Sequence, residues 1–364
     1  MAYNVSADLW FQYFNEDGPQ IWILAIAFGA RSAWAILGIS FNIGLIYVTI
    51  CNNSLHGSCN ILLAMESFFA TTMNATYLVS FVVVVCGLRF IRYQYCFPII
   101  ILPGNVLGNC AQMTMVFTGL ERLQSVLFPI WYKKRSTKTN ISLASLLLVG
   151  YSTYQFNIYY IAYQDNMDLY AIIDLMVSCS TTEIIAGKMA AQMNVNGYTL
   201  SAILMGTYTL IWVLVFKLRV TAKNVSEKNI RLAKSLMFII GFNMVGVFIK
   251  CIGLFLFQYV TVNVFVKSGY NIAFSFLTIA VYSANSPLLY LMSTEYRTRF
   301  NQHFPWLQKL VGKNTVVTTV SSVQSMSSST ISKLRQNSKQ SGGANATRTF
   351  GNINFARVVQ RSVA

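Results

Sequence analysis

The stretch Asn60–Cys86, NILLAMESFFATTMNATYLVSFVVVVC, is 27 residues long and contains a single charged side chain, that of Glu66. A helix needs about 20 predominantly apolar residues to cross roughly 30 Å of hydrocarbon, so this stretch is long enough for one crossing. Six further stretches have the same character: Ser32–Ile50, Phe97–Phe128, Ile141–Tyr163, Tyr198–Val220, Ser235–Val260 and Tyr270–Ser293. The sequence therefore predicts an all-α membrane protein, a bundle of seven transmembrane helices.

The composition agrees with a lipid environment. The chain is 55% hydrophobic and only 10% charged over 364 residues, which leaves too few charges to coat a soluble domain of this size. A net charge of +16 would indicate nucleic acid as the partner of a soluble protein. Here the positive charges flank apolar stretches, so the lipid bilayer is the expected partner and nucleic acid is not.

The basic residues also predict the topology. Lys and Arg concentrate on the cytoplasmic side of membrane proteins. In this chain they follow the third stretch and connect the fifth to the sixth: Lys133, Lys134, Arg135, Lys138, Lys217, Arg219, Lys223, Lys228, Arg231 and Lys234. We therefore expect the N-terminus outside and the C-terminus inside. Asn4 then begins the one glycosylation sequon on the outer side, Asn4-Val5-Ser6, with an unmodified tail as the alternative.

Composition divides the chain into four parts. We expect an extracellular segment (1–30), the seven-helix domain (31–294), a short cytoplasmic amphipathic helix (295–310) and a cytoplasmic tail (311–364). From Thr315 onward the tail has sixteen Ser or Thr residues, no acidic residue and no sustained period, which predicts disorder. The run Ser325–Thr330 is typical of a phosphorylation cluster, and a passive solvated tail is the alternative.

Signatures of enzymes are missing from the sequence. The chain has two histidines, and its seven cysteines show no paired metal-ligand spacing. No nucleophile elbow or phosphate-binding loop occurs either. We therefore expect no catalytic activity, no cofactor and no metal site.

Two cysteines form a candidate disulfide. Cys96 stands at the outer start of the third stretch, and Cys179 is the one cysteine in a predicted outer loop between spans. Both positions face an oxidising compartment, in which disulfides persist. The remaining cysteines lie in or beside apolar stretches and are interpreted as small buried residues.

Arg122 is the most informative single charge. It follows Cys96 by 26 residues, about 39 Å along a helix at 1.5 Å per residue, and therefore reaches the inner face. The adjacent Glu121 is placed to pair with it or with a neighbour, and such a pair would break when helices separate. The simpler alternative is an arginine that extends to the lipid phosphates.

Residues 119–132, GLERLQSVLFPIWY, resemble the inner end of the third helix and the following loop of rhodopsin-like G-protein-coupled receptors. More closely, the chain looks like the nematode serpentine chemoreceptors of the srsx class, over roughly residues 30 to 305. Asn42 and the pair Cys96 and Cys179 also match. The stretch from Asn285 to Tyr290, NSPLLY, is similar to the family's Asn-Pro-x-x-Tyr element, with Ser286 where Asn would stand.

This resemblance implies a receptor at the plasma membrane that passes an extracellular cue to a heterotrimeric G protein. It implies that coupling and switching involve Glu121, Arg122, Asn285, Pro287 and Tyr290. A phosphorylated tail would recruit arrestin. The chain departs from the family pattern at Ala70, where most members have the Asp of a sodium site, and Glu66 stands one turn earlier. Sodium modulation is therefore not expected.

The ligand is predicted only in outline. If the third helix resembles that of the family, Gly104, Asn105 and Gly108 face a cavity without a carboxylate, which disfavours an amine. Lys250 lies well inside the sixth stretch, and an intramembrane charge predicts a functional site. It would suit an anionic small molecule or a peptide C-terminus, unless it extends outward to water.

Three other functions remain open from the sequence. One is a receptor-like protein with only a structural or trafficking role, because the changed sixth helix could have lost signalling. A neuropeptide receptor would have the same fold. A transporter or channel subunit would belong to a different class, and transporters commonly show related halves. We find no internal repeat, and seven spans do not divide into equal halves, which favours the receptor.

Overall fold

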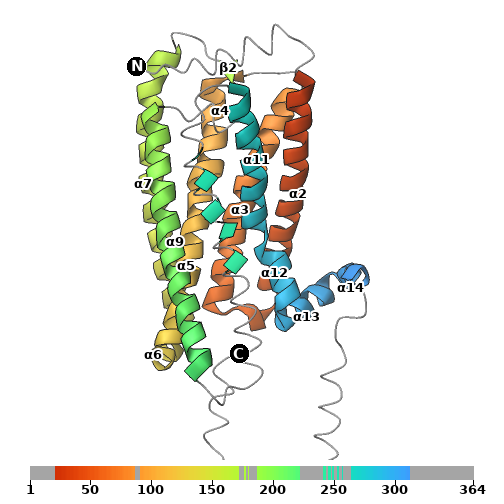
Figure 1. The fold of residues 1–364 in the computed structure, drawn as a ribbon, viewed down its shortest axis with the longest axis vertical. Helices are drawn as coiled ribbons and strands as arrows, with labels where there is room; N and C mark the ends of the chain where they lie inside the picture. The colour runs from red at the N-terminus through yellow and green to blue at the C-terminus, as the bar shows by residue number, and fades with distance from the viewer. Residues whose placement is uncertain are drawn as a thin grey trace, which may run out of the picture. The chain divides into compact units, whose positions relative to one another are not determined.

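The computed structural model describes residues 21–86, 91–171, 176–177, 179, 187–221 and 264–311, together with isolated residues between 241 and 256. Six long helices run side by side in the bundle (Figure 1). They are α2 (Ile21–Cys51), α3 (Ser58–Val85), α5 (Leu107–Leu127), α7 (Thr137–Ala171), α9 (Gly187–Thr221) and α11 (Val264–Ser283).

Shorter elements connect and extend these helices. They are η2 (Asn53–Leu55), β1 (Ile91–Arg92), α4 (Tyr93–Ile100), η3 (Ile101–Val106), α6 (Pro129–Lys134), β2 (Met176–Val177), α12 (Asn285–Met292), α13 (Thr294–His303) and α14 (Pro305–Val311). β1 and β2 pair antiparallel, with Ile91 opposite Val177. The described residues from Asn301 to Val311 belong to a second unit, so the bundle is described up to Phe300.

Length and composition allow several of these helices to cross a membrane. Among the described residues, four helices are long and apolar enough, or five if α11 and α12 count as one span bent by 44°. α7 has 35 residues but is more polar than the four, and most of the predicted sixth segment lies outside the described residues. The count of seven spans therefore stays a prediction.

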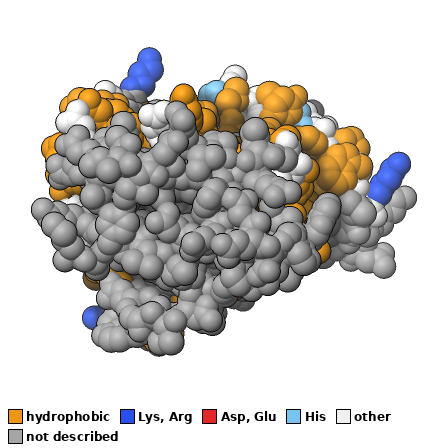
Figure 2. Space-filling model, turned by 90° about the horizontal axis from the view of Figure 1, so that it is seen from above, with side chains coloured by type: hydrophobic (Ala, Val, Ile, Leu, Met, Phe, Trp, Pro, Cys, Tyr) orange, Lys and Arg blue, Asp and Glu red, His pale blue; other side chains and the backbone are white. Residues whose placement is uncertain are grey.

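Apolar side chains cover parts of the surface. On α7, Leu146 is 69% exposed, and Val149 and Ile161 are also exposed. Seen from above, apolar side chains gather along one edge, and Lys and Arg side chains appear at a few points (Figure 2). Exposed apolar residues of this kind are what a helix presents to lipid.

The first helix begins earlier than the sequence predicted. By hydropathy the predicted span started at Ser32, directly after Arg31, but α2 starts at Ile21. Arg31 is 2% exposed, and its guanidinium carbon lies 4.5 Å from the ring centre of Phe28 and 5.0 Å from that of Tyr77. Aromatic faces attract a cation, so a charge that appeared to end the span is accommodated inside it.

The third helix is continuous from α4 through η3 to α5. The η3 segment is a π-helix that contains Pro103, which has no backbone N–H to donate. Directly beyond Pro103, Gly104 approaches α3, where a Cβ would lie 3.2 Å from the Thr76 hydroxyl oxygen. One turn later, a Cβ at Gly108 would lie 3.0 Å from the Met73 sulfur. The two glycines thus let α3 and α5 pack closely.

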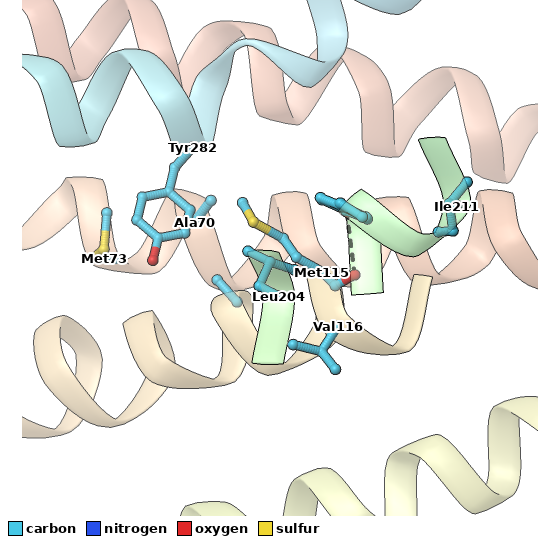
Figure 3. Packing of buried hydrophobic residues seen from close by; sticks show 9 residues of the cluster. Ala70, Met73, Met115, Val116, Leu204, Ile211 and Tyr282 are labelled. Atoms are coloured by element: carbon cyan, nitrogen blue, oxygen red, sulfur yellow. Dashed lines mark hydrogen bonds between the residues drawn. The ribbon is translucent and has the colours of Figure 1, made fainter. Parts of the chain in front are cut away.

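The apolar core lies where four helices meet. Ala70 of α3, Met115 of α5, Leu204 of α9 and Tyr282 of α11 belong to one buried cluster (Figure 3). α3 packs against both α2 and α5, and α5 packs against α9. These helices hold the polar side chains described next.

Candidate functional site

The disulfide predicted between Cys96 and Cys179 is confirmed. Their Cα atoms lie 5.4 Å apart, and both cysteines are fully buried. The Cys179 carbonyl also accepts a hydrogen bond from the Ser80 hydroxyl at 2.9 Å. The segment around β2 is therefore attached to both α4 and α3. We call this the disulfide end of the bundle.

At the opposite end, Glu121 joins three helices. Its carboxylate is buried and accepts hydrogen bonds on one oxygen, Oε1, from the Ser58 and Tyr132 hydroxyls. The Tyr132 bond measures 2.9 Å. Ser58 begins α3 and Tyr132 belongs to α6, so one carboxylate ties α5 to both. Within the described structure its second oxygen, Oε2, has no hydrogen-bond partner.

The position of Tyr132 follows from the local sequence. Pro129 starts α6, because its fixed φ suits a first helical turn and that turn does not use its missing N–H. At the far end of α6, the Arg135 guanidinium lies over the Trp131 ring and donates to the Gln124 side chain at 3.3 Å. α6 is thereby held against α5. Burial raises the pKa of Tyr132 to about 12, so its hydroxyl stays protonated and able to donate at neutral pH.

The hydrogen bonds of Glu121 do not go to the adjacent Arg122. Within the described residues its carboxylate bonds to Ser58 of α3 and Tyr132 of α6. The sequence left two partners open for Glu121, Arg122 or a neighbour, and the structure has neighbours. Ser58 was not predicted for this site, and no sequence motif marks it.

A second polar contact joins α3 to α12. The Asn285 amide nitrogen donates to Glu66 Oε1 at 2.5 Å, and both side chains are 1% exposed. Eight residues further along α3, the Asn74 amide donates to the Ser283 hydroxyl at 3.2 Å. Asn42 of α2 is likewise fully buried. Polar groups at this depth need partners, and the Asn285 amide nitrogen and Glu66 Oε1 supply them for each other. Within the described residues, Asn285 Oδ1 and the Asn42 side chain have no hydrogen-bond partner.

The bend between α11 and α12 lies beside this contact. The two helix axes differ by 44° at Ala284, and Pro287 follows within the first turn of α12. Pro287 has no N–H to donate to the carbonyl of Ser283, which weakens the helix at this point. Further along, Tyr290 is buried and packs edge-to-face on Phe300, with ring centres 6.0 Å apart.

The predicted ligand residues are only partly described. Asn105 is half-buried in η3, and Gly104 and Gly108 lie against α3 as described above. Their role in ligand binding stays a prediction. Lys250 and Asn4 lie outside the described residues. Within the described ranges, His, Cys, Asp and Glu form no group of three or more that would bind a metal ion.

Sequence reasoning missed the amides near the middle of the bundle. A cavity lies between α5 and α11, lined by Gln112 and Met115 on one side and by Thr278 and Tyr282 on the other. The Gln112 amide donates to the Ser201 hydroxyl of α9 at 2.9 Å. A glutamine in an apolar helix is the signal that would have indicated an interhelical bond.

Comparison with known families identifies a relationship over most of the bundle. The family described as serpentine type 7TM GPCR chemoreceptor Srsx matches residues 35–304. This range includes both polar sites and the disulfide. No curated protein matches the chain.

Proposed function

Because the chain belongs to the Srsx family of serpentine seven-transmembrane chemoreceptors, we propose that it couples an extracellular small-molecule or peptide cue to a heterotrimeric G protein. Family membership favours this function over a transporter or channel subunit. The observation that carries the proposal is the Glu121 site, where one buried carboxylate joins α3, α5 and α6 next to Arg122.

The proposed topology follows from the charges and the disulfide. The disulfide end would face the extracellular side, where an oxidising environment keeps the bond between Cys96 and Cys179. The Arg122 end would face the cytoplasm, because the basic residues around α6 mark an inner loop. The chain would cross the plasma membrane seven times, with its C-terminal tail inside.

The proposed mechanism is a shift between two arrangements of the bundle. A ligand changes the balance only if it binds one arrangement better than the other. In the described arrangement Ser58 and Tyr132 hold Glu121, and Asn285 holds Glu66. Separation at the Arg122 end would break the first contact and expose Arg122 to the G protein. The bend at Pro287 supplies the flexible point in the seventh helix.

The tail adds a second proposed partner. The cluster from Ser325 to Thr330 lies outside the described residues and has hydroxyl groups at nearly every position. Phosphorylation would add negative charge to this cluster. Basic residues of arrestin would then bind the phosphorylated tail. A receptor truncated after Lys313 would then keep its response but signal for longer.

The proposal is tested by screening pools of small molecules and peptides on cells that express the chain with a promiscuous G protein. The matched control is Arg122→Ala at equal surface level. A pool that activates the native chain and not the control supports the proposal. Equal responses from both, or G-protein-independent ion or solute flux in the native chain, would contradict it.

A further inference from the structure

Three hydrogen bonds between side chains join α5, α7 and α9 pairwise. An amide takes part in each bond, and each bond links two different helices. The bonds are Asn109 to the Tyr159 hydroxyl at 3.3 Å (α5 to α7), Gln112 to the Ser201 hydroxyl at 2.9 Å (α5 to α9) and Asn196 to the Gln155 carbonyl oxygen at 3.2 Å (α9 to α7). We call these six residues the amide clasp.

Most of the clasp is shielded from water. Gln112 and Ser201 are 2% and 1% exposed, and Gln155 and Tyr159 are buried as completely, whereas Asn109 and Asn196 are half-buried. The Gln155 amide nitrogen is also engaged, because it donates to the Tyr151 hydroxyl at 2.8 Å. The hydrocarbon of a bilayer offers no replacement partner, so a bond broken at a buried member would leave a polar group unsatisfied. The closed clasp is therefore favoured.

Closer to the Arg122 end, α5 and α9 are held by direct packing. The Tyr208 hydroxyl of α9 donates to the Met115 carbonyl at 3.3 Å. Gly119 lies so close to the Tyr208 ring that a Cβ there would be 2.7 Å from a ring carbon. The contact between α5 and α9 thus extends over several turns. Within the described Gly187–Thr221, α9 has no proline at which it would bend.

The other side of the cavity is built differently. α11 packs on α2 and α3, and described residues of the sixth segment meet it through two glycines seven residues apart. A Cβ at Gly246 would overlap Val281, and one at Gly253 would overlap the Phe274 ring. The Tyr270 hydroxyl donates to the Gly253 carbonyl at 3.3 Å. These contacts do not involve α5, α7 or α9; α11 meets α5 and α9 through Tyr282 in the apolar core.

We propose that the amide clasp holds α9 against α5 and α7 as one static unit. The change of arrangement that belongs to the proposed function would then take place outside this unit, at α12 and the sixth segment. The clasp residues are positioning residues, since they act by fixing helices. That a G protein triggers this change rests on the proposed function. The clasp itself does not depend on that function.

The test measures distances between helices by pulsed electron spectroscopy on the full chain in lipid nanodiscs. Spin labels are carried by an unnatural amino acid, so the native cysteines stay in place. One pair of labels replaces Leu120 of α5 and Leu210 of α9, and the other replaces Leu120 and Leu291 of α12; all three side chains are exposed. Each pair is measured with and without a nucleotide-free heterotrimeric G protein.

The clasp is broken by Gln112→Leu together with Asn196→Leu. Ser201→Ala is the milder variant if the first does not fold. The matched control is Gln164→Leu, which removes an exposed glutamine bond to Tyr160 within α7 and joins no helices. We expect one narrow α5–α9 distance in the native chain and the control, and a second or broader distance in the clasp variants.

Addition of the G protein tests the amide clasp and the proposed coupling separately. We expect it to leave the α5–α9 distance unchanged and to shift the α5–α12 distance. A shift of the α5–α9 distance in the native chain, or clasp variants as narrow as the control, would overturn the clasp. An unchanged α5–α12 distance would instead contradict coupling, while the comparison of clasp variants with the control would still decide the clasp.

Discussion

Asn285 and Glu66 are 219 residues apart in the sequence, and in the fold the Asn285 amide donates to the Glu66 carboxylate at 2.5 Å. Most rhodopsin-like receptors have the Asp of a sodium site at the position where this chain has Ala70. The structure places a carboxylate one turn earlier on the same helix and still joins it to the seventh helix. A polar link between α3 and α12 is therefore present without an acid at position 70.

Glu66→Ala should destabilise the bundle, because it leaves the buried Asn285 amide without an acceptor. An unsatisfied buried donor costs about 1–3 kcal/mol. Glu66→Gln should cost less, since its amide oxygen still accepts. The measurement is the thermal unfolding midpoint in nanodiscs, with Thr72→Val as control, because its hydroxyl is exposed and bonds within α3. Equal midpoints for the Ala and Gln variants would reject the role of this bond.

Tyr132→Phe should raise basal G-protein activation, because it removes one of the two donors that hold Glu121. A hydrogen bond contributes about 1 kcal/mol net, which corresponds to roughly a fivefold shift in population. Combination with Ser58→Ala should raise basal activity further. The readout is basal G-protein activation at equal surface level. Tyr160→Phe is the control, since Tyr160 bonds only within α7, and an equal rise there would contradict the prediction.

Arg122→Ala should abolish coupling and leave the receptor at the surface. The residue lies on α5 next to Glu121, far along the helix from the disulfide end. Arg122→Lys separates two roles: a residue that reaches lipid phosphates keeps its function as Lys, whereas forked contacts need the planar guanidinium. We expect the Lys variant to fail as well. G-protein activation and surface labelling decide this, and a normally signalling Ala variant would remove the main support for the mechanism.

Cys96→Ser and Cys179→Ser should each reduce the amount of folded receptor by a similar degree. The bridge attaches β2 to α4, and loss of a native disulfide costs about 2–5 kcal/mol in small domains. The double variant should be no worse than either single one, because all three lack the same bond. Surface labelling measures this, and non-reduced peptide mass spectrometry that finds both thiols free in the native chain would refute it.

Local features of the sequence determined the helices and the disulfide. Span length and apolar content depend on neighbouring residues, so α3 and the inner part of the third helix, α5, lie where the apolar stretches predicted them, whereas α9 starts at Gly187, before the predicted Tyr198. Hydropathy placed the start of the first span too late, after Arg31, because a charge in the sequence carries no information about which aromatic rings will surround it. Cys96 and Cys179 were predictable because topology alone placed them at one end.

The partners of the polar side chains were decided by tertiary structure. That Glu121 binds Ser58 and Tyr132, that Glu66 binds Asn285, and that Gln112 binds Ser201 depends on which faces of separate helices meet. Hydropathy determines that a segment enters the membrane and leaves its rotation about its own axis open. Rotation and packing set the distances between side chains far apart in the sequence, and those distances decide which buried polar groups satisfy one another.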